Sequence, residues 1–329
     1  MRVFAGLIPA GLGLAVAMVL SAPAQGQREQ LDQANAALQA GEADKALALL
    51  NTLDKLDKPG GSAEAYNLRC RVEYTLEQWN QAANDCEQAV KLDGQSSDDH
   101  LWLGRALGEK ASRASFLSAY SLARRVRAEF EEAARLNPRN VEALAAQCEF
   151  YYSAPGVVGG GISKSEMVAA ELDRIDPARA HELRGHIAEQ RKDYGTAERE
   201  YKQAITGSAH PAFQWITLAS FYCGRQLWTE MESAIRSGEN AAARDKHAGV
   251  ALFNGASLLR ATNRDPARAA KMLEVYLGGS DKTEEGPAFV AHVWLARLKE
   301  QLGDTAAASR ERAAALALAH EYKPALEIK

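Results

Sequence analysis

The stretch AHELRGHIAEQRKDYGTAEREYKQAI, residues 180–205, decides the fold. It reads as a helix, a short turn beside Tyr194, and a second helix. Ala197 and Ala204 follow this tyrosine by three and ten positions, so they lie two turns apart on one side of the second helix. Small side chains let antiparallel helices approach closely, and bulky ones fill the gaps between stacked hairpins. The stretch therefore predicts a helical hairpin that stacks on others of its kind.

The same plan recurs along the chain. Residues 65–93, AYNLRCRVEYTLEQWNQAANDCEQAVKLD, and residues 213–235, FQWITLASFYCGRQLWTEMESAI, each place a tryptophan at the turn, Trp79 and Trp228. In the first of them, Ala82 and Ala89 repeat the spacing of the small residues. A fixed period of this kind is typical of solenoid proteins. Extending the register gives units at about 28–58, 63–94, 97–138, 141–177, 178–208, 212–244, 248–279 and 287–319.

These units resemble the tetratricopeptide repeat (TPR), a helix–turn–helix unit of 34 residues. The first-helix pattern of that family is matched by Trp215, Leu218, Ala219, Tyr222 and Trp228. The second-helix pattern is matched by Gly185, Tyr194, Ala197, Tyr201 and Ala204. The resemblance implies an all-α, right-handed, TPR-like helical solenoid of about eight repeats that spans residues 25–329. We expect the first and last repeats to deviate, because one face of each has to meet water.

The first residues predict export. Arg2 precedes an apolar run from Val3 to Leu20, and Ala22 and Ala24 satisfy the small-residue rule for signal peptidase. We therefore expect a signal peptide at residues 1–24 and a secreted or periplasmic protein; an uncleaved membrane anchor is the alternative.

Two units are too long for the register, and both carry the excess at the turn between their helices. We expect inserted turns near residues 108–125 and 153–164, and insertions at equivalent points of neighbouring repeats project from the same edge. One interpretation is that the inserts pack on each other. The residues that would make this contact are Phe116, Leu117, Tyr120 and Leu122 on one side, and Val157, Val158 and Ile162 on the other.

The other interpretation is an anion site on the inserts. Cations concentrate around the first insert in an acidic protein whose net charge is −4. Guanidinium and ammonium groups suit a carboxylate or a phosphate, but the glutamates of the following helix would also pair with them. The candidate anion patch is Lys110, Arg113, Arg124, Arg125, Arg127 and Lys164.

The second insert contains a glycine run, GVVGGGISKS at residues 156–165, that only superficially resembles a phosphate-binding loop. A P-loop needs glycine before its lysine and a strand before the loop. Here Ser163 precedes Lys164, Val158 occupies the other glycine position, and the preceding segment reads as a helix. We interpret the run as a loop that needs the dihedral freedom of glycine.

Four cysteines follow the predicted cleavage site. Cys70 and Cys86 fall at a similar height on the two helices of one hairpin, and an exported protein meets an oxidising compartment. A Cys70–Cys86 disulfide is therefore one possibility, and buried free thiols are the other. The segment HELRGH places His181 and His186 five positions apart, about 140° around a helix, so the two do not share a metal ion as an i, i+4 pair does.

The first helices of TPR units line the concave groove of the solenoid. Transferring those positions to this chain gives the candidate partner groove: Asn67, Arg71, Tyr74, Arg105, Glu149, Tyr152, Glu182, His186 and Glu189. A mixture of polar and aromatic side chains suits an extended peptide, and a solvated helix face is the alternative. Asn67 and Arg71 do not reproduce the Lys/Asn carboxylate clamp known from the family.

These observations predict a non-enzymatic scaffold of the cell envelope that binds extended protein segments in its groove. The alternative is a receptor for a small anion at the inserted turns. We expect no catalytic residue, cofactor or metal site, since no nucleophile or acid–base pair stands at a usable spacing. The acidic net charge argues against nucleic acid as a partner.

Overall fold

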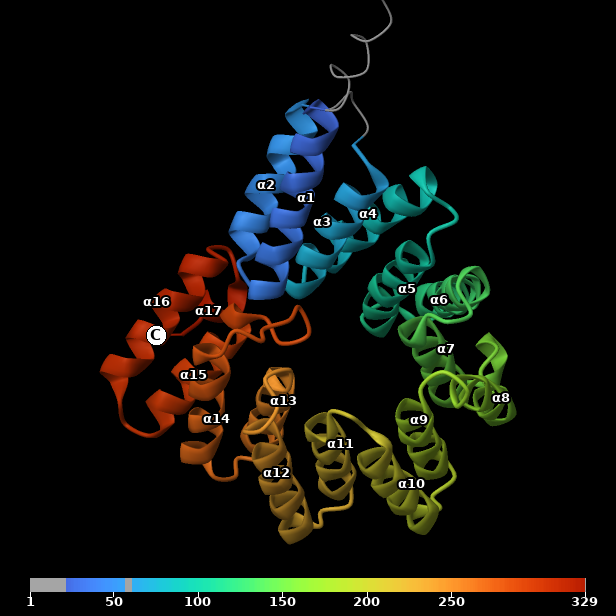
Figure 1. Ribbon diagram of the computed structural model, residues 1–329, viewed down its shortest axis with the longest axis vertical. Coiled ribbons are helices and arrows are strands. Elements are labelled where there is room, and N and C mark those ends of the chain that lie inside the picture. The colour runs from blue at the N-terminus through green and yellow to red at the C-terminus, as the bar shows by residue number, and fades with distance from the viewer. Residues whose placement is uncertain (1–21, 57–60, 329) are drawn as a thin grey trace, which may run out of the picture.

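The computed structural model describes residues 22–56 and 61–328, and within these ranges the chain folds into helices. The predicted signal peptide lies outside the described residues except for its last three, which begin the first helix. Eight helical hairpins follow one another and a short helix ends the chain (Figure 1). The pairs are α1 Ala22–Ala40 with α2 Ala43–Leu56, α3 Ala63–Thr75 with α4 Trp79–Leu92, α5 Ser97–Ser112 with α6 Phe116–Leu136, α7 Val141–Ser153 with α8 Ile162–Leu172, α9 Pro177–Gln190 with α10 Tyr194–Gly207, α11 Pro211–Gly224 with α12 Trp228–Ala242, α13 Gly249–Ala261 with α14 Pro266–Gly278, and α15 Ala288–Gln301 with α16 Thr305–Leu318; α17 is Lys323–Leu326. The expected all-α solenoid of about eight repeats is confirmed.

Local sequence explains where many helices begin. An N-cap side chain accepts a hydrogen bond from the backbone N–H three residues later, which satisfies a donor that has no partner within the helix. Polar residues serve as such caps before helices α3, α5, α7, α9, α10, α14 and α16. They are Ser62, Ser96, Asn140, Asp176, Asp193, Asp265 and Asp304.

Six hairpins share one turn geometry. In each, a residue one or two positions after the end of the first helix has a left-handed backbone, and the next residue donates a hydrogen bond to the carbonyl five positions earlier. This 6→1 bond is the mark of the Schellman motif. The left-handed residues are Gly41, Glu77, Lys192, Gln226, Asn263 and Gly303. The α5–α6 and α7–α8 hairpins depart from it, and these are the two units that are too long in sequence.

Gly185 shows why the repeat pattern needs a glycine in the first helix. A Cβ at this position would lie 2.5 Å from the ring of Tyr201 on the second helix. We expect Gly185→Ala to lower the free energy of unfolding by about 2 kcal/mol, because Tyr201 is buried and held by hydrogen bonds. Gly255→Ala is the matched control, since the nearest atoms to its Cβ would be the terminal methyl groups of two side chains, Met272 at 2.5 Å and Ile216 at 3.1 Å, which can shift more easily than a ring. Urea denaturation of both variants tests this, and an equal loss would contradict it.

The solenoid closes into a ring. In Figure 1 the chain curves round until α1 and α2 lie beside α15, α16 and α17. Leu38 and Leu50 of the first repeat belong to the same apolar cluster as Phe289, Val293 and Tyr322 of the last. The expectation that the terminal repeats each turn one face to water is therefore wrong, because these two faces cover each other.

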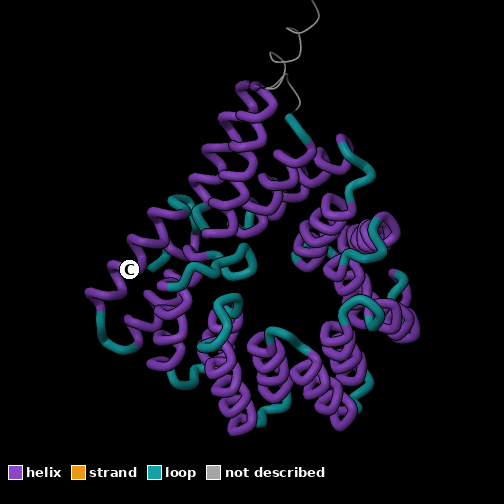
Figure 2. The backbone as a smooth tube through the Cα atoms, viewed as in Figure 1, coloured by secondary structure: helices purple, strands orange, loops and turns teal. Residues whose placement is uncertain are grey.

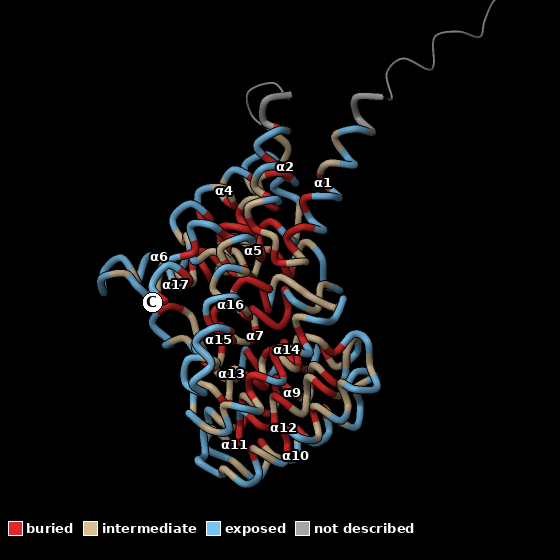
Figure 3. The backbone as a smooth tube through the Cα atoms, turned by 90° about the vertical axis from the view of Figure 1, so that its left-hand side faces the viewer, coloured by how far each residue is buried: buried red, intermediate tan, exposed pale blue. Residues whose placement is uncertain are grey.

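Polar contacts reinforce this seam. Asp44 accepts a hydrogen bond from the backbone N–H of His320 at 2.9 Å, and Tyr322 donates to Glu77 at 3.2 Å. The loop between α14 and α15, residues 279–287, reaches from the last repeats toward α1 and α3 (Figures 1 and 2). Buried residues form a band within the layers of helices, and exposed ones lie along the edges (Figure 3).

The first predicted insert is not an inserted turn. Residues 108–125 belong almost entirely to α5 and α6, which have 16 and 21 residues, and only residues 113–115 connect them. Of the second predicted insert, residues 154–161 form a loop that joins α7 to α8 and contains one 3-10 turn, η1 Gly156–Val158, whereas residue 153 ends α7 and residues 162–164 begin α8.

The two long units do meet, but not through the contacts considered above. Val158 is buried, and Leu122 and Ile162 pack against the same core. Phe116, Leu117 and Val157 instead stay exposed. The mutual-packing interpretation is therefore right only for the inner residues of the two segments. Across the described ranges, no helix combines the length and the apolar character needed to cross a bilayer.

Candidate functional site

The inner wall of the ring carries the candidate site. First helices α1, α3, α5, α7, α9, α11 and α13 contribute to pockets along it. Most predicted groove residues line these pockets: Asn67, Arg71, Arg105, Glu149, Glu182, His186 and Glu189. The concave arrangement that the repeat pattern implied thus brings them to one surface, and ring closure makes that surface an enclosed wall.

The largest of these pockets, about 490 Å³, lies between α1, α3, α5, α7 and the 279–287 loop; we call it the acidic pocket. Three arginines line it: Arg28, Arg71 and Arg105. Eight carboxylates line it with them: Asp32, Glu64, Asp93, Asp98, Asp99, Glu142, Glu284 and Glu285. Negative charge therefore prevails in this part of the wall.

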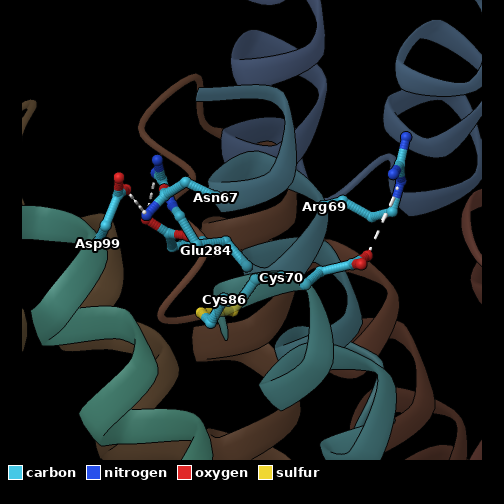
Figure 4. The surroundings of a disulfide bond; sticks show 8 residues. Asn67, Arg69, Cys70, Cys86, Asp99 and Glu284 are labelled. Atoms are coloured by element: carbon cyan, nitrogen blue, oxygen red, sulfur yellow. Dashed lines mark hydrogen bonds and ion pairs between the residues drawn. A yellow bond between two sulfur atoms is a disulfide. The ribbon is translucent and has the colours of Figure 1, made fainter. Parts of the chain in front are cut away.

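Asn67 and Asp99 join α3 to α5 at the bottom of the acidic pocket. The amide of Asn67 donates a hydrogen bond to Asp99 Oδ1 at 2.6 Å, and both residues are buried (Figure 4). Burial raises the pKa of Asp99 to about 6, although hydrogen bonds from Ser96 and Asn67 oppose the rise. Asn67, which was predicted to contact a partner, instead makes a hydrogen bond that connects the second repeat to the third.

Arg71 binds within the chain. Its guanidinium makes two hydrogen bonds to the carboxylate of Glu284, at 2.9 and 2.7 Å, and the amide of Gln39 donates to the same carboxylate at 3.2 Å. A two-bond arginine–carboxylate pair is among the strongest polar contacts. It fastens the 279–287 loop to the first two repeats.

Trp102 is the aromatic centre of the acidic pocket. The guanidinium carbons of Arg71 and Arg105 lie 5.5 and 4.7 Å from the centre of its ring, and Tyr74 packs edge-on against it. The predicted groove residue Tyr74 is thus part of the wall behind the pocket. Arg105 is paired with Glu142 at 2.8 Å.

A partly buried charge network follows on α7 and α9. Arg179 lies 2.6 Å from Glu182 Oε1 and 3.4 Å from Glu149 Oε1. Burial raises the pKa of Glu182, and the positive charge of Arg179 opposes this rise. For Arg179 itself, burial would lower the pKa, but the negative charges of Glu182 and Glu149 outweigh burial and raise it. Glu149 and Glu182 were predicted from the sequence, and the arginine that holds both was not.

His186 connects the next group on the wall. Its ring stacks on Tyr152 with 5.9 Å between centroids, and its Nδ1 lies 2.8 Å from the hydroxyl of Tyr201. Tyr201 donates to Glu189. Burial raises the pKa of Glu189, but hydrogen bonds from His186 and Tyr201 outweigh it and lower the pKa. His181 faces away from this group and pairs with Glu200 of α10 at 2.7 Å.

Most of the predicted anion patch is already paired. Arg113, Arg125 and Arg127 form ion pairs with Glu109, Glu87 and Glu131 at 2.5, 2.7 and 3.5 Å. Lys164 donates to the carbonyl of Gly159 at 2.9 Å and lies over the ring of Tyr151. Lys110 and Arg124 make no ion pair with the described residues.

The glycine run serves packing. Gly159 has φ 101°, and a Cβ there would lie 2.1 Å from Arg127 Nη1. A Cβ on Gly160 would lie 1.8 Å from the carbonyl oxygen of Ala154. The amide of Gly160 donates to the carbonyl of Pro155, and that of Gly161 donates to the carbonyl of Tyr151 on α7, so they are not free to bind phosphate.

Cys70 and Cys86 are joined by a disulfide between α3 and α4, with an S–S distance of 2.00 Å (Figure 4). This is the pairing that the sequence analysis considered. Cys148 and Cys223 are free.

Similarity to known proteins appears in structure and not in sequence. No protein-family model matches the chain, and no curated protein matches its sequence. A solved TPR protein of Thermus thermophilus is similar with a TM-score of 0.50 at 16% identity, over 59% of this chain and 98% of that one. A tetratricopeptide repeat protein from Parabacteroides merdae has a TM-score of 0.46 at 12% identity, over 84% and 99% of the two chains.

Proposed function

Because the chain has the fold of the tetratricopeptide-repeat proteins, we propose that it is an interaction scaffold that holds an extended, positively charged protein segment against its inner wall. The observation that carries this proposal is the charge balance of the acidic pocket. Such a segment supplies backbone donors and acceptors along the wall and cations where the wall is acidic.

The arginines of the acidic pocket are not available for an acidic ligand. Arg28 pairs with Asp32 and Glu64, Arg71 with Glu284, and Arg105 with Glu142. Asp98 and Glu285 line the same pocket and make no ion pair with the described residues. A lysine or arginine of a bound segment would therefore find carboxylates without an ion pair in the pocket that Trp102 also lines.

The alternative, a small-anion receptor at the two long units, has less support. Three of its arginines already form ion pairs with glutamates of the chain, and the N–H groups of the glycine loop donate hydrogen bonds to backbone carbonyls of the chain. We therefore propose binding at the inner wall and no catalytic activity.

We also propose that the scaffold works in the cell envelope after export. The N-terminal sequence has the pattern of a cleaved signal peptide. The Cys70–Cys86 disulfide is consistent with an oxidising compartment.

Neutralising the inner wall should weaken binding of a basic peptide. The probe is a fluorescent ten-residue peptide of alternating lysine and glycine, and its affinity for the purified protein is measured by anisotropy. We expect the triple variant Asp32→Asn, Glu64→Gln, Glu285→Gln to bind it about tenfold more weakly, a loss of about 1.4 kcal/mol. Asp32 and Glu64 are partly exposed, and the side chain of Glu285 makes no ion pair with the described residues, so the fold should survive.

The matched control carries Glu171→Gln, Glu230→Gln and Glu300→Gln, three exposed carboxylates that line none of the inner-wall pockets. It changes the net charge equally and should leave the affinity unaltered. A glutamate–glycine peptide that binds as tightly as the lysine peptide, or equal weakening by both triple variants, would refute the cationic-segment proposal.

A further inference from the structure

The corner between α5 and α6 exposes large apolar side chains. With 21 residues, α6 is seven residues longer than α10, its equivalent in a regular repeat, which is about 10 Å of additional helix. At its first turn, Phe116 and Leu117 are 86% and 81% exposed, and Tyr120 is also exposed. We call these three residues the α6 tip. Apolar residues this exposed and adjacent are a feature that folding alone does not require.

The α6 tip has a cation on the same face. At 100° per residue, Phe116, Leu117, Tyr120 and Arg124 fall within an arc of about 100° around α6. Arg124 stands two turns above Phe116, is exposed and makes no ion pair with the described residues. An arginine at this height can keep its charge at a polar layer while the tip enters an apolar one.

The charged residues of the surrounding sequence are all basic. From Lys110 to Ala128 there are five basic residues and no acidic one, in a chain of net charge −4. The two cations without an ion pair among the described residues, Lys110 and Arg124, flank the tip on α5 and α6. The N-terminus of α6, the positive end of its dipole, lies at the tip itself. The cations and the apolar side chains of this corner therefore suit the same kind of partner, which has anionic groups at its surface and hydrocarbon beneath them.

We propose that the α6 tip docks the protein on a lipid bilayer that contains anionic phospholipids. Phe116 and Leu117 enter the boundary between headgroups and acyl chains, and Arg124 and Lys110 meet the lipid phosphates. None of the three tip residues lines the acidic pocket or the other inner-wall pockets, so the inner wall stays available to its own ligand. This inference does not depend on what the inner wall binds.

Vesicle co-sedimentation tests the proposal, with vesicles of equal parts phosphatidylglycerol and phosphatidylcholine and with pure phosphatidylcholine. We expect binding to the anionic vesicles, and about tenfold weaker binding by Phe116→Ser/Leu117→Ser. Arg124→Glu should also weaken binding, and the binding that remains should depend less steeply on salt, because one cationic contact with the lipid phosphates is lost. The control Val275→Ser/Leu302→Ser removes two partly exposed apolar side chains elsewhere, 50% and 44% exposed, and should bind like the unaltered protein.

Circular dichroism checks that each variant is folded. We expect an unchanged spectrum, because the side chains that are changed are exposed. Failure of the unaltered protein to bind anionic vesicles would overturn the proposal, as would equal binding by the tip variant. Light scattering adds a further test. A dimer that Phe116→Ser/Leu117→Ser converts to a monomer, with no vesicle binding, would assign the tip to self-association instead.

Discussion

Replacing Gly41 with alanine should open the ring. Gly41 lies in the α1–α2 turn with φ 72°, and a Cβ there would lie 2.3 Å from the backbone nitrogen of Ala288 and 2.9 Å from its Cβ. Neither atom belongs to a flexible side chain, so the first repeat has to move away from α15. We expect a loss of about 2–4 kcal/mol in the free energy of unfolding, from left-handed strain and overpacking together. Urea denaturation measures the loss, and small-angle scattering should show a larger radius of gyration.

Gly303→Ala separates the two causes. Gly303 occupies the same turn position in the last repeat with φ 83°, and its Cβ would meet nothing within 4 Å. This variant carries the backbone strain, about 1 kcal/mol, without the clash, and should keep the dimensions of the ring. If both variants lose the same stability and neither expands, the seam contact at Ala288 does not hold the ring closed.

Removing the Cys70–Cys86 disulfide is the second change with a large expected effect. The bond closes a loop of 16 residues across one hairpin, and a loop of that length contributes roughly 3 kcal/mol by restricting the unfolded chain. Cys70→Ala/Cys86→Ala should therefore lower the urea midpoint strongly. A reductant should lower the midpoint of the unaltered protein in the same way and leave that of the variant unchanged.

Cys223→Ala is the control, because Cys223 is a free and only partly buried thiol. It should keep the reductant-sensitive midpoint of the unaltered protein. A double-alanine variant with an unchanged midpoint, or an unaltered protein indifferent to reductant, would show that the hairpin does not depend on the bond.

The repeat pattern predicted the hairpins well because their contacts are local. The pairing of Gly185 with Tyr201, for example, follows from residues 16 positions apart. The error at residues 108–125 was avoidable: residues 110–125, KASRASFLSAYSLARR, contain neither glycine nor proline, and their alanines, leucines and arginines favour helix. The excess residues lengthened two helices instead of inserting a turn.

The residues of the candidate site could be predicted only where their position within a single repeat determines which way they face. Reading positions on first helices found Arg71, Glu182 and His186, but not what they contact. Glu284, the partner of Arg71, stands 213 residues later in the sequence, in a loop. The residues that meet at the seam, Gly41 and Ala288, are also more than two hundred positions apart in the sequence. Such contacts depend on the summed curvature of eight repeats, which no single unit encodes.

Ring closure also changes how the chain can come apart. An open array of repeats has two ends, and an end unit unfolds by breaking one interface, so disorder spreads inward from it. In the ring, the first and last repeats bury Leu50 and Phe289 in one cluster, so each unit has neighbours on both sides. The first unit to unfold therefore has to break two interfaces at once, wherever it lies. We therefore expect the unfolding of this protein to be more nearly all-or-none than that of an open array of eight units.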